Sequence, residues 1–114
     1  MSDLPKSVEI HEEGPREGFQ IEPGPISTAD KIKLIEALAD TGLKHIQACS
    51  FVNPRLVPGW ADAEDVSAGY QPVEDVHYSD LWFDNRGLAR AWAFRAKVSS
   101  YGSSSLTASD AFSR

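Results

Sequence analysis

The chain has 114 residues, of which 41% are hydrophobic and 25% charged, with a formal net charge of −6 at pH 7. This length is typical of one domain, and we expect no internal boundary within residues 1–114. The acidic balance, without a basic stripe, argues against nucleic-acid binding. No apolar run is long enough to span a membrane, and the polar start MSDLPKS does not resemble a signal peptide. The single cysteine, Cys49, forbids an internal disulfide and suits a reducing compartment, so we expect a cytoplasmic protein.

A turn with chemically active side chains follows the first predicted strand. That strand covers residues 7–13, in which apolar and polar side chains alternate. Gly14-Pro15 then predicts a sharp turn, after which Arg16 and Glu17 stand side by side. A cation and a carboxylate held together on a turn can clamp an anionic substrate and hold a metal ion or a proton. The alternative is a solvated salt bridge in a loop.

The rest of the chain alternates helices and strands. Ser27 and Asp30 have the spacing of a capping box, which predicts a helix from Ser27 to just before Gly42. Two more helices are predicted at 61–69 and 87–97, and three more strands at 44–52, 76–83 and 100–106.

This strand–helix repeat is typical of an α/β fold built from βα units on a parallel sheet. We expect the strands to pair in parallel and in chain order, with the helices on one side. Eight such units close a (β/α)8 TIM barrel. The chain holds about three units and the strand of a fourth, so it corresponds to roughly the first half of such a barrel.

The histidines and the cysteine all fall within predicted strands. His11, His45 and His77 occur once per repeat, which suggests a metal site. No pair has close ligand spacing such as His-x-His, and this favours packed or hydrogen-bonded strand histidines instead. Cys49 is either a nucleophile or a small core residue, and its place in mid-strand favours the core.

Strict alternation along the second strand would place Gln47 and Cys49 on the same, barrel-inward face. In part of a barrel that face is uncovered, and the first and last strands lack a neighbour. We therefore expect this face to be poorly buried and the chain to form a homo-oligomer.

Several motifs resemble the hydroxymethylglutaryl-CoA lyase family, which comprises metal-dependent retro-Claisen lyases on a TIM barrel. LPKSVEIHEEGPREGFQ is similar to the opening strand and the Gly-Pro-Arg-Asp-Gly-Leu-Gln turn of the family, and CSFVNPRLVPGWAD is similar to the loop after its second strand. The resemblance implies the N-terminal portion of an enzyme that cleaves a 3-hydroxy-acyl-CoA, such as 3-hydroxy-3-methylglutaryl-CoA, to acetyl-CoA and acetoacetate. Two alternatives stay open: a Claisen-condensing enzyme or aldolase on the same barrel, and a catalytically incomplete half-barrel fragment.

The resemblance also implies roles for individual residues. Arg16 would be the catalytic arginine that polarises the thioester carbonyl and stabilises the enolate. Glu17 stands where the family has an aspartate that ligates a divalent cation, Mg²⁺ or Mn²⁺, whose other protein ligands lie outside this chain. Gln20, Gln47 and Ser50 would line the site for the acyl-CoA substrate.

Two of these positions depart from the pattern of the family. The carboxylate of Glu17 reaches one methylene further than that of aspartate, and Gln47 replaces a glutamate near Arg16. The two departures together suggest a subgroup with another acyl-CoA substrate or with weak lyase activity. Because a single carboxylate does not hold a hard cation firmly, we expect no tight divalent-metal site in this chain alone.

Overall fold

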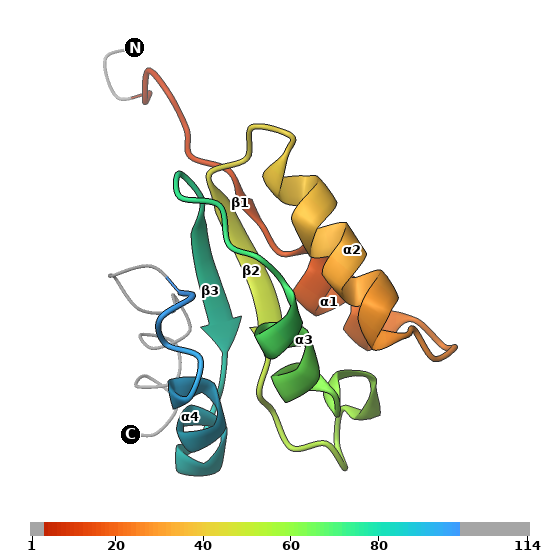
Figure 1. The fold of residues 1–114 in the computed structure, drawn as a ribbon. Helices are drawn as coiled ribbons and strands as arrows, with labels where there is room; N and C mark the ends of the chain where they lie inside the picture. Colours follow the sequence, from red (N-terminus) through yellow and green to blue (C-terminus); the bar gives the residue numbers. More distant parts are fainter. Residues whose placement is uncertain (1–3, 99–114) are drawn as a thin grey trace.

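In the computed structural model residues 4–98 are described, and they form a three-stranded parallel sheet flanked by helices (Figure 1). The strands are β1 (His11–Glu12), β2 (His45–Ser50) and β3 (His77–Leu81), paired in the order β1-β2-β3. The helices are α1 (Gly14–Ile21), α2 (Thr28–Ala39), the short 3-10 helix η1 (Pro58–Trp60), α3 (Ala63–Gly69) and α4 (Asn85–Trp92). Parallel pairing in chain order is confirmed. The strand predicted at 100–106 lies outside the described residues.

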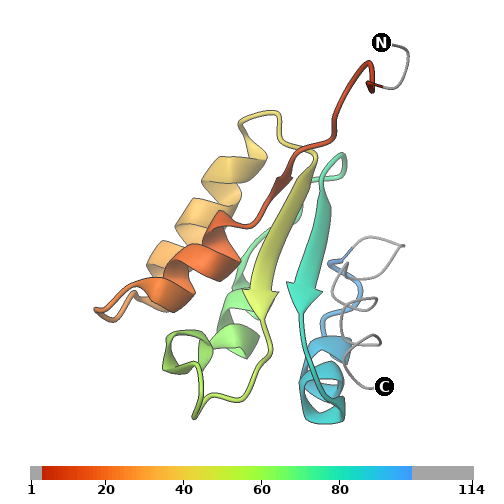
Figure 2. The ribbon, with the colours of Figure 1, turned by 180° about the vertical axis from the view of Figure 1, so that it is seen from behind.

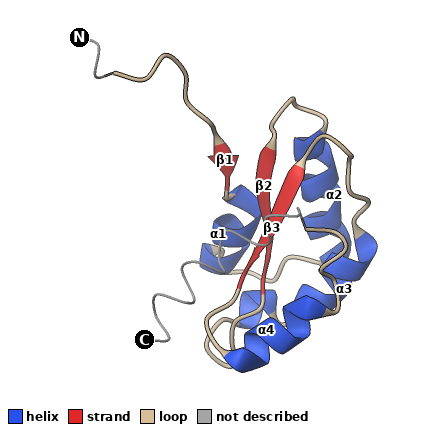
Figure 3. Cartoon of the chain, turned by 90° about the vertical axis from the view of Figure 1, so that its left-hand side faces the viewer, coloured by secondary structure: helices blue, strands red, loops and turns tan. Residues whose placement is uncertain are grey.

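The helices are unevenly distributed around the sheet. α2 and α3 pack on one face of the strands, whereas α1 and α4 lie near the carboxyl ends of β1 and β3 (Figures 1 and 3). Figure 2 shows the opposite face of the sheet, and none of the helices within residues 4–98 crosses the strands there. The longest of these helices, α2, has 12 residues, and none is both long and apolar enough to cross a bilayer.

The helix at Ser27 forms as predicted. The side-chain oxygen of Ser27 accepts a hydrogen bond of 3.1 Å from the backbone N–H of Asp30, which satisfies one of the donors that a helix start leaves unpaired. Just beyond the last turn, Gly42 has a φ of 92°, a left-handed conformation that glycine adopts without steric cost. The two ends of α2 are thus set by local sequence.

The first strand is much shorter than predicted. Only His11 and Glu12 pair with β2, and the preceding Val8 and Ile10 are 79% and 64% exposed. Alternating apolar residues extend a strand only where they find a surface to pack against. Within residues 4–98 no such surface covers Val8 and Ile10, so the predicted strand at 7–13 is wrong in its first half.

The last described helix is displaced from its predicted range. α4 begins at Asn85 because the carboxylate of Asp84 accepts the backbone N–H of Gly87 at 2.8 Å and caps the helix. It ends at Trp92 and continues as turns, so the predicted span 87–97 is wrong at both ends.

A bulge in β2 overturns the expected alternation of its side chains. Gln47 pairs with Ser79 and Cys49 with the next residue, Asp80, so β2 has one residue more than β3 at this point. Cys49 consequently contacts α3, where the hydroxyl of Ser67 donates to its sulfur at 3.1 Å. Gln47 and Cys49 are 6% and 0% exposed, and the expectation that they share a poorly buried face is wrong. Cys49 is a core residue whose pKa is raised by burial.

The core contains one carboxyl group at an energetically unfavourable place. Asp80 on β3 is 3% exposed, and its Oδ1 has no hydrogen-bond partner within the described residues. Burial disfavours the charged form and raises the pKa of Asp80 from 3.8 to about 7. The folded chain therefore retains a proton that the unfolded chain has already released at the same pH.

This difference makes stability dependent on pH. Because the folded state binds the extra proton between about pH 4 and pH 7, the contribution of Asp80 to stability falls as the pH rises through this range. Because the pKa of Asp80 is about 7 in the folded chain against an ordinary 3.8, ionising this carboxyl group above pH 7 costs roughly 4 kcal/mol of stability.

We expect Asp80→Asn to stabilise the chain at pH 8, because the amide has the shape of the carboxyl group and carries no charge. The gain should shrink by about 2–3 kcal/mol between pH 8 and pH 5. Urea unfolding of both proteins at several pH values measures this difference. Asp75→Asn, at an exposed position, is the control and should show no such trend. A gain that does not vary with pH would contradict the assignment.

Candidate active site

Arg16 and Glu17 lie in the first turn of α1 and not in a loop, so the turn predicted at Gly14-Pro15 is wrong. Pro15 suits this position, because a helix start has no partner for its missing N–H and its fixed φ is already helical. The helix is established when the backbone N–H of Glu17 donates to the carbonyl of Glu13 at 2.8 Å. α1 follows β1 directly, so Arg16 lies just beyond the carboxyl end of β1. Figure 1 shows α1 beside the sheet at this point.

The structure brings three of the predicted site residues into contact. Arg16 Nε donates to Gln47 Oε1 at 2.7 Å, and its Nη1 donates to Glu17 Oε2 at 2.5 Å. Its Nη2 lies 3.7 Å from Glu13 Oε2, beyond hydrogen-bonding distance. The side chain of Arg16 is 15% exposed and that of Glu17 is 53% exposed. The guanidinium plane is therefore fixed from two sides, while Nη2 keeps donors for another group.

The other two predicted residues lie apart from this contact. Gln20 is exposed on α1, three residues after Glu17. Ser50, at the end of β2, is fully buried, and its hydroxyl has no hydrogen-bond partner within the described residues. Within residues 4–98 the side chain of Arg16 hydrogen-bonds to Gln47 and Glu17, and to neither Gln20 nor Ser50. The substrate-binding roles of Gln20 and Ser50 stay predictions.

Trp60, in η1, fixes the backbone of α1. Its indole N–H donates to the carbonyl oxygen of Arg16 at 2.9 Å, and its ring is fully buried beside Phe19 with centroids 5.8 Å apart. The loop approaches α1 closely because residue 59 is glycine: a Cβ there would lie 2.8 Å from the carbonyl oxygen of Phe19. These contacts attach the second βα loop to the helix that carries Arg16.

A buried lysine holds that loop in turn. Lys31 on α2 is 3% exposed, and its ammonium group donates to the carbonyl of Gly59 and to Asp62 Oδ1, the latter at 2.6 Å. The same nitrogen lies 4.9 Å from the centroid of the Trp60 ring, a cation–π distance. Asp62 also accepts the hydroxyl of Thr28 at 2.5 Å. Sequence analysis missed Lys31, although its spacing of four residues from Ile35 places it on the buried face of α2.

A cavity of about 370 Å³ lies near the same end of the sheet, between the β2–η1 loop and α4. Its lining includes three arginines: Arg55, Arg86 and Arg90. Arg90 is held by Glu64 through two hydrogen bonds of 2.5 and 2.8 Å, whereas Arg55 and Arg86 are exposed. The cavity therefore presents two exposed cationic side chains, beside the carboxylate of Asp84 that caps α4.

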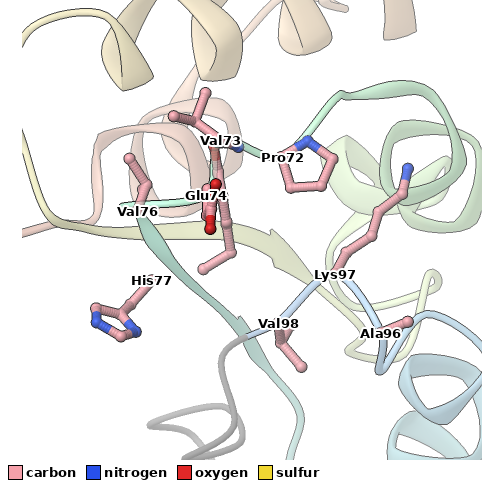
Figure 4. A pocket seen from close by; sticks show the side chains of 9 residues that line it. Pro72, Val73, Glu74, Val76, His77, Ala96, Lys97 and Val98 are labelled. Carbon is pink, nitrogen blue, oxygen red and sulfur yellow. Dashed lines mark hydrogen bonds between the residues drawn. The ribbon is translucent and has the colours of Figure 1, made fainter.

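A second hollow, of about 380 Å³, lies by the amino end of β3, with His77 and Lys97 at opposite sides of it (Figure 4). The ammonium group of Lys97 donates to the carbonyls of Ser67, Ala68 and Tyr70 at 2.7, 3.0 and 2.8 Å. Lys97 thus caps the end of α3 and ties the segment after α4 to it. This cation is engaged in a structural role.

Comparison with known proteins identifies the family. No protein-family profile matches the chain. The mitochondrial hydroxymethylglutaryl-CoA lyase of Rattus norvegicus is 44% identical over 106 residues, which are 92% of this chain and 33% of that protein. The hydroxymethylglutaryl-CoA lyase of Bacillus subtilis is 46% identical over 87 residues, 76% of this chain and 29% of the relative. The chain belongs to the hydroxymethylglutaryl-CoA lyase family. It spans about a third of the length of these curated relatives and corresponds to their N-terminal part.

Solved structures of the lyase family share the fold. The hydroxymethylglutaryl-CoA lyase of Pseudomonas aeruginosa superposes with a TM-score of 0.75 at 41% identity, covering 80% of this chain and 30% of that one. A lyase from Acinetobacter baumannii, solved in complex with coenzyme A and 3-methylmalate, gives a TM-score of 0.75 at 37% identity over 78% of this chain and 29% of its own. These lyases are TIM barrels, so the predicted fold class is confirmed, and the chain represents part of such a barrel.

We expect Lys31→Met to destabilise the chain by about 2–4 kcal/mol, because it removes the partner of a partly buried carboxylate and leaves the Gly59 carbonyl unpaired. Urea unfolding measures the loss. Lys33→Met, at an exposed position on the same helix, is the matched control and should stay within about 0.5 kcal/mol of the unchanged chain. Equal losses from the two variants would contradict the role given to Lys31.

Proposed function

We propose that this chain provides the arginine and one metal-ligating carboxylate of a lyase site. The reaction is the divalent-metal-dependent cleavage of a 3-hydroxy-acyl-CoA, such as 3-hydroxy-3-methylglutaryl-CoA, to acetyl-CoA and acetoacetate. The observation that carries the proposal is the fixed guanidinium group of Arg16 near the carboxyl end of a TIM-barrel sheet, in a chain of the hydroxymethylglutaryl-CoA lyase family. Active sites of this fold lie at that end.

Arg16 stabilises the charge that develops when the carbon–carbon bond breaks. Cleavage leaves an enolate on the acetyl-CoA portion, and its oxygen becomes negative as the bond opens. The Nη2 donors of Arg16, which lie beyond hydrogen-bonding distance of Glu13, are oriented by the bonds that Nε and Nη1 make to Gln47 and Glu17. Preorganised donors of this kind stabilise a developing oxyanion without reorganising during the reaction.

Gln47 orients Arg16 without neutralising it. Its amide oxygen accepts the Nε–H at 2.7 Å, as a carboxylate would, but carries no charge. The positive charge of Arg16 is therefore balanced by Glu17 at 2.5 Å and by Glu13 at 3.7 Å, and not by residue 47. In this proposal the change from glutamate to glutamine leaves more of that charge for the substrate.

Glu17 has the ligand chemistry that a divalent cation needs, but one carboxylate is too few protein ligands to hold the ion. Carboxylate oxygens are the hard ligands that Mg²⁺ and Mn²⁺ prefer, and this carboxylate is half exposed at the carboxyl end of the sheet. Glu17 would provide one ligand, and the others would come from outside this chain. When bound, the cation would act as a Lewis acid on the substrate oxygens. The longer side chain of glutamate offsets the ligand oxygen from its position in an aspartate.

The arginine-lined cavity is our proposed contact for the anionic portion of the acyl-CoA. Arg55 and Arg86 are exposed there near the same end of the sheet as Arg16, and guanidinium groups bind phosphate oxygens with two hydrogen bonds.

We also propose that the protein is a homo-oligomer in a reducing, cytoplasmic environment. The exposed apolar side chains Val8, Ile10 and Phe83 and the lone buried thiol of Cys49 support this proposal.

The test replaces the matched N-terminal part of the Bacillus subtilis relative with the residues of this chain, and measures acetoacetate release from 3-hydroxy-3-methylglutaryl-CoA with Mg²⁺. We expect Arg16→Met to lower kcat by about 100- to 1,000-fold, because it removes oxyanion stabilisation. Glu17→Ala should abolish turnover, whereas Glu17→Asp should preserve or raise it by restoring the shorter reach.

The control is Glu22→Gln, at the end of α1, which should leave kcat unchanged. Circular dichroism establishes that each variant is folded. A folded chimera whose activity survives both Arg16→Met and Glu17→Ala would refute the proposed roles, and the pair would then be a surface salt bridge.

A further inference from the structure

Three histidines form a stacked row at the amino ends of the strands, at the opposite end of the sheet from Ser50. Parallel pairing places His11 beside His45 and His45 beside His77. The rings of His11 and His45 are 4.1 Å apart at an angle of 7°, and those of His45 and His77 are 5.0 Å apart at 18°. The backbone register of the sheet therefore fixes side chains that are 34 and 32 residues apart in the sequence.

A carboxylate bridges the first two rings. Glu9 Oε1 lies 2.6 Å from His11 Nε2, and Glu9 Oε2 lies 3.2 Å from His45 Nε2. One ligand atom from each of the three residues lies within 4.8 Å of the other two. Two imidazole nitrogens and one carboxylate thus converge on one small space.

We propose that Glu9, His11 and His45 bind a divalent transition-metal ion of the Zn²⁺ class at the amino end of the sheet. Two imidazoles and a carboxylate are a donor set that suits Zn²⁺, Co²⁺ or Ni²⁺ better than Mg²⁺, which prefers oxygen ligands. This site differs in place and in donor chemistry from the single carboxylate Glu17, and it does not depend on the proposed lyase activity.

The distances are close to those of a bound ion. Zinc ligands at about 2.0–2.1 Å in a tetrahedron lie about 3.4 Å from one another. The two contacts of Glu9, 2.6 and 3.2 Å, are already near or below this value. Binding then requires the two stacked rings to tilt so that both nitrogens face the ion, while the parallel pairing of β1 and β2 holds their backbones in place.

The site is accessible to an ion from solvent. The side chains of Glu9, His11 and His45 are 65%, 50% and 23% exposed, so water can complete the coordination shell. His77 packs against the far side of the His45 ring, which restricts the rotation of that imidazole. This packing restricts the orientation of one of the two nitrogen ligands before an ion binds.

The experiment titrates the chelator-treated chain with ZnCl2 by isothermal titration calorimetry, and with CoCl2 by visible absorption. We expect one Zn²⁺ per chain with micromolar or tighter affinity, and a Co²⁺ spectrum without a thiolate band because Cys49 is buried. Glu9→Gln, His11→Asn and His45→Asn should each weaken binding at least about tenfold. Glu17→Ala and Glu13→Gln are the matched controls and should bind Zn²⁺ as the unchanged chain does.

The proposal is overturned if the unchanged chain binds no Zn²⁺, or if binding survives the double variant His11→Asn, His45→Asn. Loss of Zn²⁺ binding in Glu17→Ala would also overturn it, since the ion would then lie at the other end of the sheet. Circular dichroism tests the fold of each variant, and His11→Asn, at an exposed position, carries the test if His45→Asn does not fold. Because the readout is metal binding, an inactive lyase chimera has no bearing on this result.

Discussion

The buried ammonium group of Lys31 is the interaction on which the geometry around Arg16 depends. It joins α2 to the loop after β2 through Gly59 and Asp62, and it lies against the ring of Trp60. Trp60 in turn donates to the carbonyl oxygen of Arg16. A charge in a core is tolerated only when its hydrogen-bonding groups are paired, so this lysine restricts the loop to a single position. The backbone position of Arg16 is thus set from α2, a helix that does not carry this residue.

The bulge in β2 gives the strand two different functions within a few residues. Without it, Gln47 and Cys49 would face the same way and would compete for the same environment. With it, Gln47 meets Arg16 while Cys49 enters the core beside Ser67. The extra residue separates a polar contact from apolar packing, and both side chains become buried.

Local rules predicted the elements that depend on local chemistry. The capping of α2 by Ser27, the left-handed Gly42 and the parallel order of the strands followed from short patterns and loop lengths. Two predictions are wrong. Gly14-Pro15 is compatible with a turn as well as with the start of α1, and the bulge at Gln47 leaves no pattern in a single strand. The spacing favours packed or hydrogen-bonded strand histidines, and the rings are indeed stacked and hydrogen-bonded. That the three histidines share one register becomes visible only when the strands are paired. Arg16 and Glu17 stand out in the sequence because a cation and a carboxylate adjoin directly after Gly14-Pro15, whereas lysine is an ordinary residue type for a helix surface.

The short first strand has a consequence for how the chain responds to ionic strength. Residues 7–10 bury little apolar surface, and Val8 and Ile10 are mostly exposed, so the contacts of Glu9 with His11 and His45 carry much of their attachment. When the imidazoles are protonated, these contacts join opposite charges and added salt screens them, while excluded salts such as sulfate strengthen apolar burial. The two parts of the molecule should therefore respond in opposite directions. In concentrated sulfate the core would tighten while the segment before β1 would detach and become open to proteases.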